Sequence, residues 1–293
     1  MLGIPLHYLM QHPLATLELA SDPVGTWTRI REEVVARRER RGPQCQYKSD
    51  PNWEAWFHSR LGLTFPSQFT SEFQDLWPTV MTELKARGIR AGPESFQSWN
   101  DGDAGFVRAI WCLVRCLQPK NVVETGVAHG VTSRFILEAL VRNGDGCLWS
   151  IDLPPIEKAW QSQVGVAVPD RLTKRWTHIK GLSRLRLPEL LKQLGEIELF
   201  VHDSMHSERN VRFELDQAWA KLKAGGAVVV DDVDANWGFH RFTQTVSGYQ
   251  SVICDAEPLR PDVRRFNRKG LFGILLKERL AGSSQDRLQP VTE

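Results

Sequence analysis

Acidic side chains follow two apolar segments that are predicted strands. Asp203 comes directly after residues 197–202, and Asp231 and Asp232 close the segment that begins at residue 227. Neighbouring carboxylates raise one another's pKa unless a cation is present. Carboxylate oxygens are ligands that Mg²⁺, Ca²⁺ and Mn²⁺ prefer. If the two strands are neighbours in a sheet, these side chains predict a divalent-cation site; the alternative is that some of them cap helices or face water.

A glycine-containing loop follows the first predicted strand, residues 121–124. It has the sequence Glu124-Thr-Gly126-Val-Ala-His-Gly130, and its glycines allow a sharp turn and a close approach to a ligand. The pattern Gly-x-Gly-x-x-Gly of dinucleotide-binding loops is absent, because positions 128 and 131 are Ala and Val. We expect a ligand without a pyrophosphate, with Glu124 facing a cationic group. An ordinary tight turn is the alternative.

Two further strand ends supply polar side chains to the same predicted edge. Asp152 closes the strand 147–152, where a carboxylate can accept hydrogen bonds from ribose hydroxyls. Ser183 follows the strand 176–180, and its hydroxyl suits either the border of an adenine ring or a helix cap.

The elements that must position these residues alternate between strand and helix. Helices are predicted over residues 106–117, 132–141, 156–166, 185–194, 208–222 and 239–247. This alternation is typical of a mostly parallel sheet covered on both faces. Two late strands, 250–254 and 271–276, lack a full helix between them and predict an antiparallel pair. The predicted fold class is α/β, a Rossmann-like, doubly wound, seven-stranded sheet with an antiparallel edge pair, preceded by a helical N-terminal element.

The first hundred residues differ from the rest of the chain. They are rich in Trp, Pro and Arg; a helix is predicted over residues 26–41, and aromatic residues recur at helical spacing between 53 and 77. We therefore expect residues 1–100 to be a helical cap or accessory region, 101–280 the ligand-binding domain, and 281–293 a disordered tail.

The composition favours a packed globular protein. Hydrophobic residues make up 42% and charged residues 25%, and the net charge of +2 favours neither nucleic acid nor a membrane as partner. No apolar run approaches the roughly 18–20 residues that span a bilayer. Five cysteines without a Cys-x-x-Cys pair predict free thiols. We expect a cytoplasmic protein, with a homodimer as the default assembly.

With these motifs the chain resembles the class I S-adenosylmethionine-dependent methyltransferases. It is most similar to the branch that contains catechol O-methyltransferase-like and antibiotic-tailoring sugar O-methyltransferases. The resemblance covers about residues 105–280 and rests on segments 123–130, 201–206 and 224–232. It implies S-adenosylmethionine as cofactor, a methyltransferase domain over 101–280, and methyl transfer to a hydroxyl of a small molecule such as a sugar or a phenol.

The resemblance also implies roles for individual residues. The cofactor-binding positions are Glu124, Gly126 and Gly130 around the methionine part, Thr132 near its carboxylate, Asp152 at the ribose, Ser183 near the adenine, and Asp203. Asp203, Asp231 and Asp232 occupy the metal-binding positions of the metal-dependent members, although the catechol enzymes have Asn at the last of these. His206 stands where those enzymes carry a general-base lysine. His240 is a second candidate base.

Three alternatives stay open. An NAD-type oxidoreductase would use the same fold, but the missing third glycine and Glu124 disfavour it. A metal-independent N- or C-methyltransferase, or a non-catalytic S-adenosylmethionine-binding protein, would keep the predicted cofactor site. The identity of the methyl acceptor does not follow from the sequence.

Overall fold

The computed structural model describes residues 23–41, 45–89, 103–153, 155, 158–256 and 270–279. The predicted tail, residues 281–293, lies outside these described residues.

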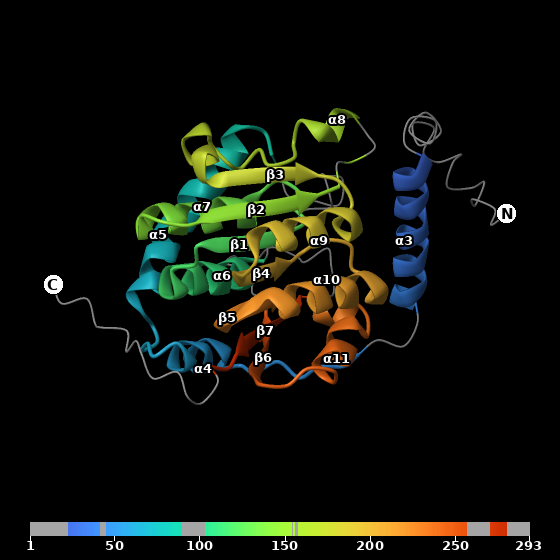
Figure 1. The fold of residues 1–293 in the computed structure, drawn as a ribbon. Helices are drawn as coiled ribbons and strands as arrows, with labels where there is room; N and C mark the ends of the chain where they lie inside the picture. Colours follow the sequence, from blue (N-terminus) through green and yellow to red (C-terminus); the bar gives the residue numbers. More distant parts are fainter. Residues whose placement is uncertain are drawn as a thin grey trace.

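A seven-stranded sheet forms the centre of the molecule (Figure 1). Its strands are β1 (Asn121–Thr125), β2 (Cys147–Asp152), β3 (Trp176–Lys180), β4 (Ile197–His202), β5 (Leu222–Val230), β6 (Tyr249–Asp255) and β7 (Leu271–Lys277). Their order is β3-β2-β1-β4-β5-β7-β6. Strands β1 to β5 are parallel, and β7 runs antiparallel to both β5 and β6. The predicted fold class is therefore confirmed.

Strand β5 begins at Leu222, earlier than the predicted residue 227. Leu222 pairs with Ile197 of β4, and the register then shifts before Leu199 pairs with Ala227. Gly226 lies at this shift, where a Cβ atom would stand 2.7 Å from the carbonyl oxygen of Glu198. Gly226 thus allows two strand backbones to approach closely.

Helices cover both faces of the sheet. Their bounds are α3 (Pro23–Arg41), α4 (Trp53–Arg60), α5 (Gln68–Ala86), α6 (Ala104–Leu117), α7 (Val131–Asn143), α8 (Lys158–Gln161), α9 (Ser183–Leu194), α10 (Glu208–Lys221) and α11 (Gly238–Thr243), with 3₁₀ turns η2 (Asp170–Arg175) and η3 (Val233–Ala235). Of the described helices, none is both long enough and apolar enough to cross a membrane.

Alternate residues of each strand enter two separate apolar cores. Val122 of β1 packs in the core shared with α5, α6 and α7, whereas Val123 packs in the core shared with α9, α10 and α11. This alternation follows from the period-two geometry of a strand. Because both faces are covered, the polar strand ends are left as the place for a ligand.

The helix predicted over 156–166 is largely wrong. Of the described residues in that range, 158–166, only Lys158–Gln161 form a helix, α8, and turns follow it. The backbone N–H of Gly165 donates to the carbonyl of Ala128 at 2.8 Å, and that of Ala167 donates to the carbonyl of His129 at 2.8 Å. These groups bond to the loop after β1 instead of closing helical turns. Helix α11 likewise ends at Thr243, before the predicted residue 247.

The described N-terminal helices have two different positions. Helices α4 and α5 contribute to the core beneath α6 and α7, through residues such as Phe57 and Phe73. Helix α3 stands beside the edge toward which the arrows of β1, β2 and β3 point (Figure 1). Its contacts with the body include α10. Helix α3 therefore faces the carboxyl ends of the parallel strands.

Candidate active site

Two glycines shape the loop that follows β1. Gly126 has a φ of +86° and Gly130 a φ of +79°, in the left-handed region that favours glycine. A Cβ atom on Gly126 would lie 1.9 Å from the carbonyl oxygen of Asp203, and one on Gly130 would lie 2.9 Å from Cα of Gly165. Glycine is therefore required at both positions by the neighbouring backbone as well as by φ.

The contact at Gly126 joins the ends of two strands. The backbone N–H of Asp203 donates to the carbonyl of Thr125 at 2.9 Å, and that of Gly126 donates to the carbonyl of Ile151 at 2.9 Å. The N–H of Asp231 donates to the carbonyl of His202 at 2.9 Å. Backbone pairing thus continues to the very ends of the strands, and it fixes the polar residues that come next.

Glu124 is fully buried behind this loop. Its Oε2 accepts hydrogen bonds from the hydroxyls of Ser133, at 2.6 Å, and Ser150, at 2.7 Å. Burial raises the pKa of Glu124 to about 8, although both hydroxyls act to lower it. Its other oxygen, Oε1, has no hydrogen-bond partner among the described residues. Glu124 therefore links β1, β2 and α7 through one of its two carboxylate oxygens.

The remaining predicted cofactor residues surround the same edge. Oδ1 of Asp152 accepts a hydrogen bond from the N–H of Val127 at 3.2 Å, which ties the end of β2 to the glycine loop. Thr132 lies half-buried in the first turn of α7. Ser183 begins α9, and its side chain helps to lower the pKa of Glu214. Its predicted role near an adenine stays a prediction.

An acidic cluster lies at the ends of β4 and β5. Ligand atoms of Asp203, His206 and Asp231 all lie within 4.8 Å of one another. Nδ1 of His206 stands 3.2 Å from Oδ2 of Asp232, and its Nε2 stands 4.0 Å from Oδ1 of Asp203. The structure therefore brings together Asp203 and Asp231 as predicted. It places Asp232 beside the imidazole and adds His206 to the group that could hold an ion.

Electrostatics at this cluster favour a cation. Burial raises the pKa of Asp203 and of Asp231, and repulsion from Asp232 raises both further, whereas the charge of His206 lowers that of Asp203. Asp103, at the start of α6, adds to the repulsion on both groups. This role of Asp103 does not follow from the sequence, because nothing in it shows that α6 begins beside β4 and β5. Two carboxylates and an imidazole are donors that suit Mg²⁺ or Mn²⁺, so the residues fit the predicted metal.

His240 has a different environment from His206. It lies half-buried in α11, where its Nε2 is 3.1 Å from Nε2 of Gln244. Its ring packs edge-on against Trp237, with 5.4 Å between the centroids. These contacts are local to α11 and the residues directly before and after it, whereas His206 touches the acidic cluster directly. Of the two candidate bases, His206 is the better placed.

Glu214 of α10 is a site residue that the sequence did not single out. It is fully buried, and its oxygens accept hydrogen bonds from Thr125 at 2.6 Å, from His202 at 2.7 Å and from Ser204 at 2.9 Å. Burial alone would raise the pKa of Glu214, but the charge of His202 and these hydrogen bonds lower it to about 2. One ionised carboxylate thus holds the ends of β1 and β4 together beneath the site.

A comparison with protein families agrees with this site. Residues 123–233, which run from β1 past the end of β5, match a family described as a methyltransferase domain. The match contains the glycine loop and the acidic cluster. The predicted resemblance and the predicted enzyme class, a methyltransferase, are therefore confirmed. None of the curated proteins compared with the chain matches it.

Solved structures of similar fold include three O-methyltransferases. TomG of Streptomyces achromogenes, in complex with SAM, is 16% identical with a TM-score of 0.49 over 78% of this chain and 97% of its own. A putative enzyme of Klebsiella pneumoniae is 14% identical with a TM-score of 0.49 over 77% and 97%. The enzyme of Bacillus cereus, in complex with SAH, is 14% identical with a TM-score of 0.48 over 76% and 97%.

Proposed function

We propose that this protein is an S-adenosylmethionine-dependent O-methyltransferase that methylates a hydroxyl of a small molecule, such as a sugar or a phenol, with the help of a divalent cation. One observation supports the proposal above all others: Gly126 touches the backbone of Asp203. The loop that would hold the methyl donor and the cluster that would hold the cation are therefore adjacent. A donor and an acceptor bound there would meet at one point.

The chain's own residues would position the two reactants. The glycine loop and Asp152 would hold the cofactor, and Asp203 and Asp231 would hold the cation that orients the acceptor oxygen. A divalent cation lowers the pKa of a hydroxyl bound to it, and S-adenosylmethionine supplies a methyl group on a sulfonium sulfur. Holding acceptor and methyl in line can contribute up to roughly 7–11 kcal/mol toward the barrier.

Methyl transfer also needs a place for the acceptor's proton. The acceptor oxygen would form the new C–O bond, and S-adenosylmethionine would supply the methyl carbon and keep the electron pair of its C–S bond on sulfur. The acceptor hydroxyl gives its proton to His206, whose Nδ1 is oriented by Asp232 at 3.2 Å. Such a base contributes roughly 10²–10⁴ in rate. His206 also belongs to the group of residues that could hold the cation. Cation binding and proton transfer would therefore compete for this side chain.

Titration calorimetry tests the proposal on the whole chain. We expect S-adenosylhomocysteine to bind and NAD not to bind. We expect Mg²⁺ to bind the unchanged protein and the control Asp216→Asn, which alters an exposed carboxylate of α10, but not Asp231→Asn. Absence of binding by S-adenosylhomocysteine would sink the proposal.

The same titrations separate the remaining alternatives. S-adenosylhomocysteine binding without Mg²⁺ binding would refute the metal and favour N- or C-methylation. Cofactor binding together with Mg²⁺ binding, but without methyl transfer to a panel of sugars and phenols, would favour a non-catalytic binding protein. The homodimer and the cytoplasmic location stay predictions, and light scattering would test the first.

A further inference from the structure

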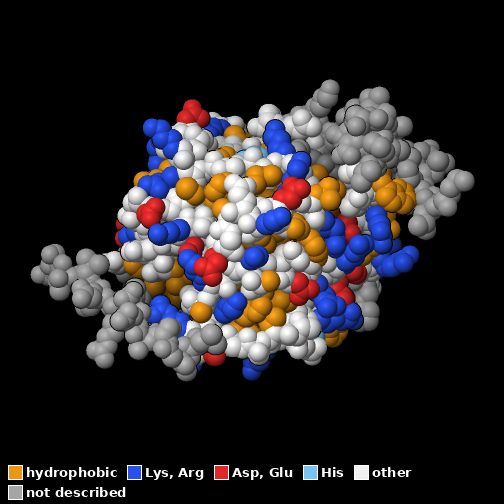
Figure 2. Space-filling model, viewed as in Figure 1, with side chains coloured by type: hydrophobic (Ala, Val, Ile, Leu, Met, Phe, Trp, Pro, Cys, Tyr) orange, Lys and Arg blue, Asp and Glu red, His pale blue; other side chains and the backbone are white. Residues whose placement is uncertain are grey.

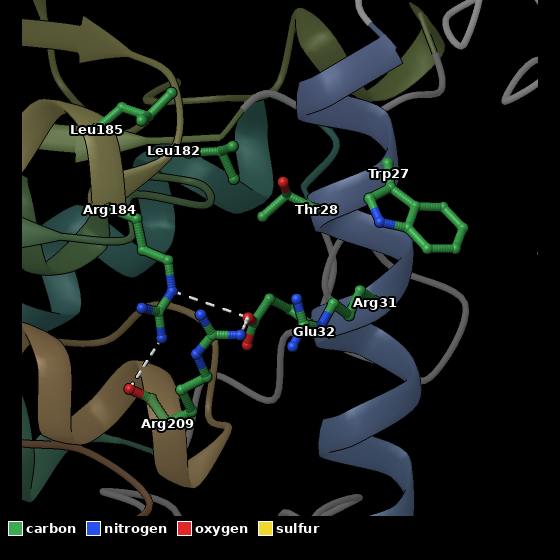
Figure 3. Close-up of a pocket in the computed structure, with 8 residues that line it drawn as sticks. All are labelled: Trp27, Thr28, Arg31, Glu32, Leu182, Arg184, Leu185 and Arg209. Carbon is green, nitrogen blue, oxygen red and sulfur yellow. Dashed lines mark hydrogen bonds and ion pairs between the residues drawn. The ribbon is translucent and has the colours of Figure 1, made fainter. Parts of the chain in front are cut away.

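A pocket lies between α3 and the first turns of α9 and α10, with a volume of about 180 Å³ (Figure 3). Its walls are Trp27, Thr28, Arg31 and Glu32 from α3, Leu182, Arg184 and Leu185 from the start of α9, and Arg209 from α10. We call it the arginine pocket. It lies on the side of the sheet where β3 and β4 end, the side that also carries the glycine loop and the acidic cluster.

The charges around the arginine pocket do not balance. Three guanidinium groups face one carboxylate, Glu32. Burial lowers the pKa of Arg184, and repulsion from Arg209 and Arg31 lowers it further, against the attraction of Glu32 and of Glu214. Lys and Arg side chains also gather on the visible surface where α3 meets α10 (Figure 2). The pocket therefore carries excess positive charge beside a helix that already shields part of it from water.

Glu32 leaves one buried hydrogen-bond donor of Arg184 unfilled. Its Oε2 accepts a hydrogen bond from the hydroxyl of Ser207 at 2.7 Å. Its Oε1 lies 3.8 Å from Nε of Arg184 and 3.8 Å from Nη1 of Arg209, which is too far for a hydrogen bond. Nε of Arg184 is buried and has no hydrogen-bond partner among the described residues. A buried donor of this kind costs free energy until an acceptor reaches it.

Arg184 is nevertheless held in place. Its Nη2 donates to the carbonyl of Arg209 at 2.9 Å, and its guanidinium lies 4.8 Å from the ring centroid of Phe213. Only 19% of the side chain is exposed. The guanidinium is thus preorganised, with one edge anchored to α10 and the Nε edge directed toward Glu32 across the pocket (Figure 3).

We propose that the arginine pocket binds an anionic group, a phosphate, sulfate or carboxylate, carried by the methyl acceptor. Guanidinium groups match the planar and tetrahedral oxygen geometry of these anions. The pocket is smaller than the roughly 300–1,000 Å³ that enclose a whole small ligand, so it takes a group while the rest of the molecule extends outside. Leu182 and Leu185 give the ligand an apolar neighbour. This inference rests on the proposed function for its choice of ligand.

Calorimetry with simple probes tests the pocket independently of turnover. Inorganic phosphate, phenyl phosphate and phenol are titrated at low salt into the full chain saturated with S-adenosylhomocysteine. We expect phenyl phosphate to bind more tightly than either phosphate or phenol. Arg184→Ala and the exposed Arg31→Ala should each weaken phenyl phosphate binding about 10-fold or more. The controls Arg186→Ala on α9 and Arg38→Ala on α3 should change it less than about 2-fold.

Three results would overturn the inference. Phosphate and phenyl phosphate binding that is absent, or unchanged in both pocket variants, would show that the arginines hold no anion. Phenyl phosphate that binds no more tightly than inorganic phosphate would show that the anion is not part of an acceptor. Phenyl phosphate that binds the cofactor-free chain in a parallel titration, but not the chain saturated with S-adenosylhomocysteine, would assign the pocket to the cofactor. Failure of S-adenosylhomocysteine itself to bind is a separate measurement and would refute the proposed function instead.

Discussion

At the scale of single residues, Gly126 determines how closely the glycine loop approaches the backbone of Asp203. A comparison of Gly126 with Gly144 separates this effect from that of backbone conformation. Gly126 and Gly144 have φ values of +86° and +80°. A Cβ atom on Gly126 would lie 1.9 Å from the carbonyl oxygen of Asp203, whereas nothing lies within 4 Å of one on Gly144. The two positions therefore share the same backbone strain and differ only in the space available.

Gly126→Ala should consequently cost much more than Gly144→Ala. An L-residue in the left-handed region costs roughly 1–2 kcal/mol, which Gly144→Ala measures alone. Gly126→Ala must also displace the end of β4, so we expect several kcal/mol of further destabilisation in urea unfolding and loss of S-adenosylhomocysteine binding. Equal losses in the two variants would show that the loop relaxes away from Asp203.

Glu124 gives the molecule a pH dependence of opposite sign to that of an ordinary ion-paired carboxylate. Burial raises its pKa to about 8, whereas an unfolded glutamate titrates near 4.3. The folded state therefore holds the proton more tightly. Its contribution to stability is complete below about pH 4.3 and is lost as the pH rises through about 8.

Relative to Glu124→Gln, the unchanged protein should therefore lose stability between about pH 5 and 8. The slope is at most about 1.4 kcal/mol per pH unit and the total a few kcal/mol. Urea unfolding of both proteins at several pH values measures the difference. A difference that stays constant with pH would contradict a protonated, buried Glu124.

At the scale of elements, the ends of the strands could be predicted from the sequence. The hydrogen bonds by which Glu214 connects the ends of β1 and β4 could not. Apolar runs followed by Asp203 and Asp231 indicate strands and their carboxyl ends, and the site prediction depends on little more. Glu214 falls in an amphipathic helix, where a carboxylate usually faces solvent. Its partner Thr125 is 89 residues away in the sequence, so no local pattern connects them.

Replacing Glu214 should lower both the stability of the fold and the affinity for S-adenosylhomocysteine. Glu214→Ala leaves buried donors of Thr125, His202 and Ser204 without their acceptor, and the loss of one partner of a buried pair costs roughly 3–5 kcal/mol. Glu214→Gln keeps the volume and part of the acceptor capacity, so its cost should be smaller and its affinity for S-adenosylhomocysteine closer to that of the unchanged protein. The control is Asp216→Asn on the exposed side of the same helix.

Calorimetric titration then distinguishes a positioning role from a merely structural one. If Glu214 positions the strand ends, Glu214→Ala weakens S-adenosylhomocysteine binding under conditions where the variant is fully folded. Unchanged affinity in the folded variant would limit Glu214 to stability.

At the scale of the whole molecule, the aromatic residues of α4 and α5 turn out to belong to the main core. Their helical spacing predicts packing faces, but a sequence cannot show which surface a face meets. In the structure, Phe73 and Trp77 of α5 both pack on Phe135 of α7, with centroid distances of 5.0 and 5.3 Å. Trp53 of α4 packs on Phe272 of β7 at 5.3 Å. Helices α4 and α5 thus share their apolar surface with the sheet domain.

This shared core predicts a single cooperative unfolding transition that includes α5. Phe73 is fully buried, and its replacement by Ala should cost roughly 3–5 kcal/mol through lost burial and the cavity left behind. Because α5, α6 and α7 lose packing together, Phe73→Ala should lower the midpoint of the whole calorimetric transition. Leu185→Ala, at an exposed position of α9, is the control and should leave the midpoint nearly unchanged. If the N-terminal helices formed an independent unit, Phe73→Ala would instead split off an early transition and leave the main one where it was.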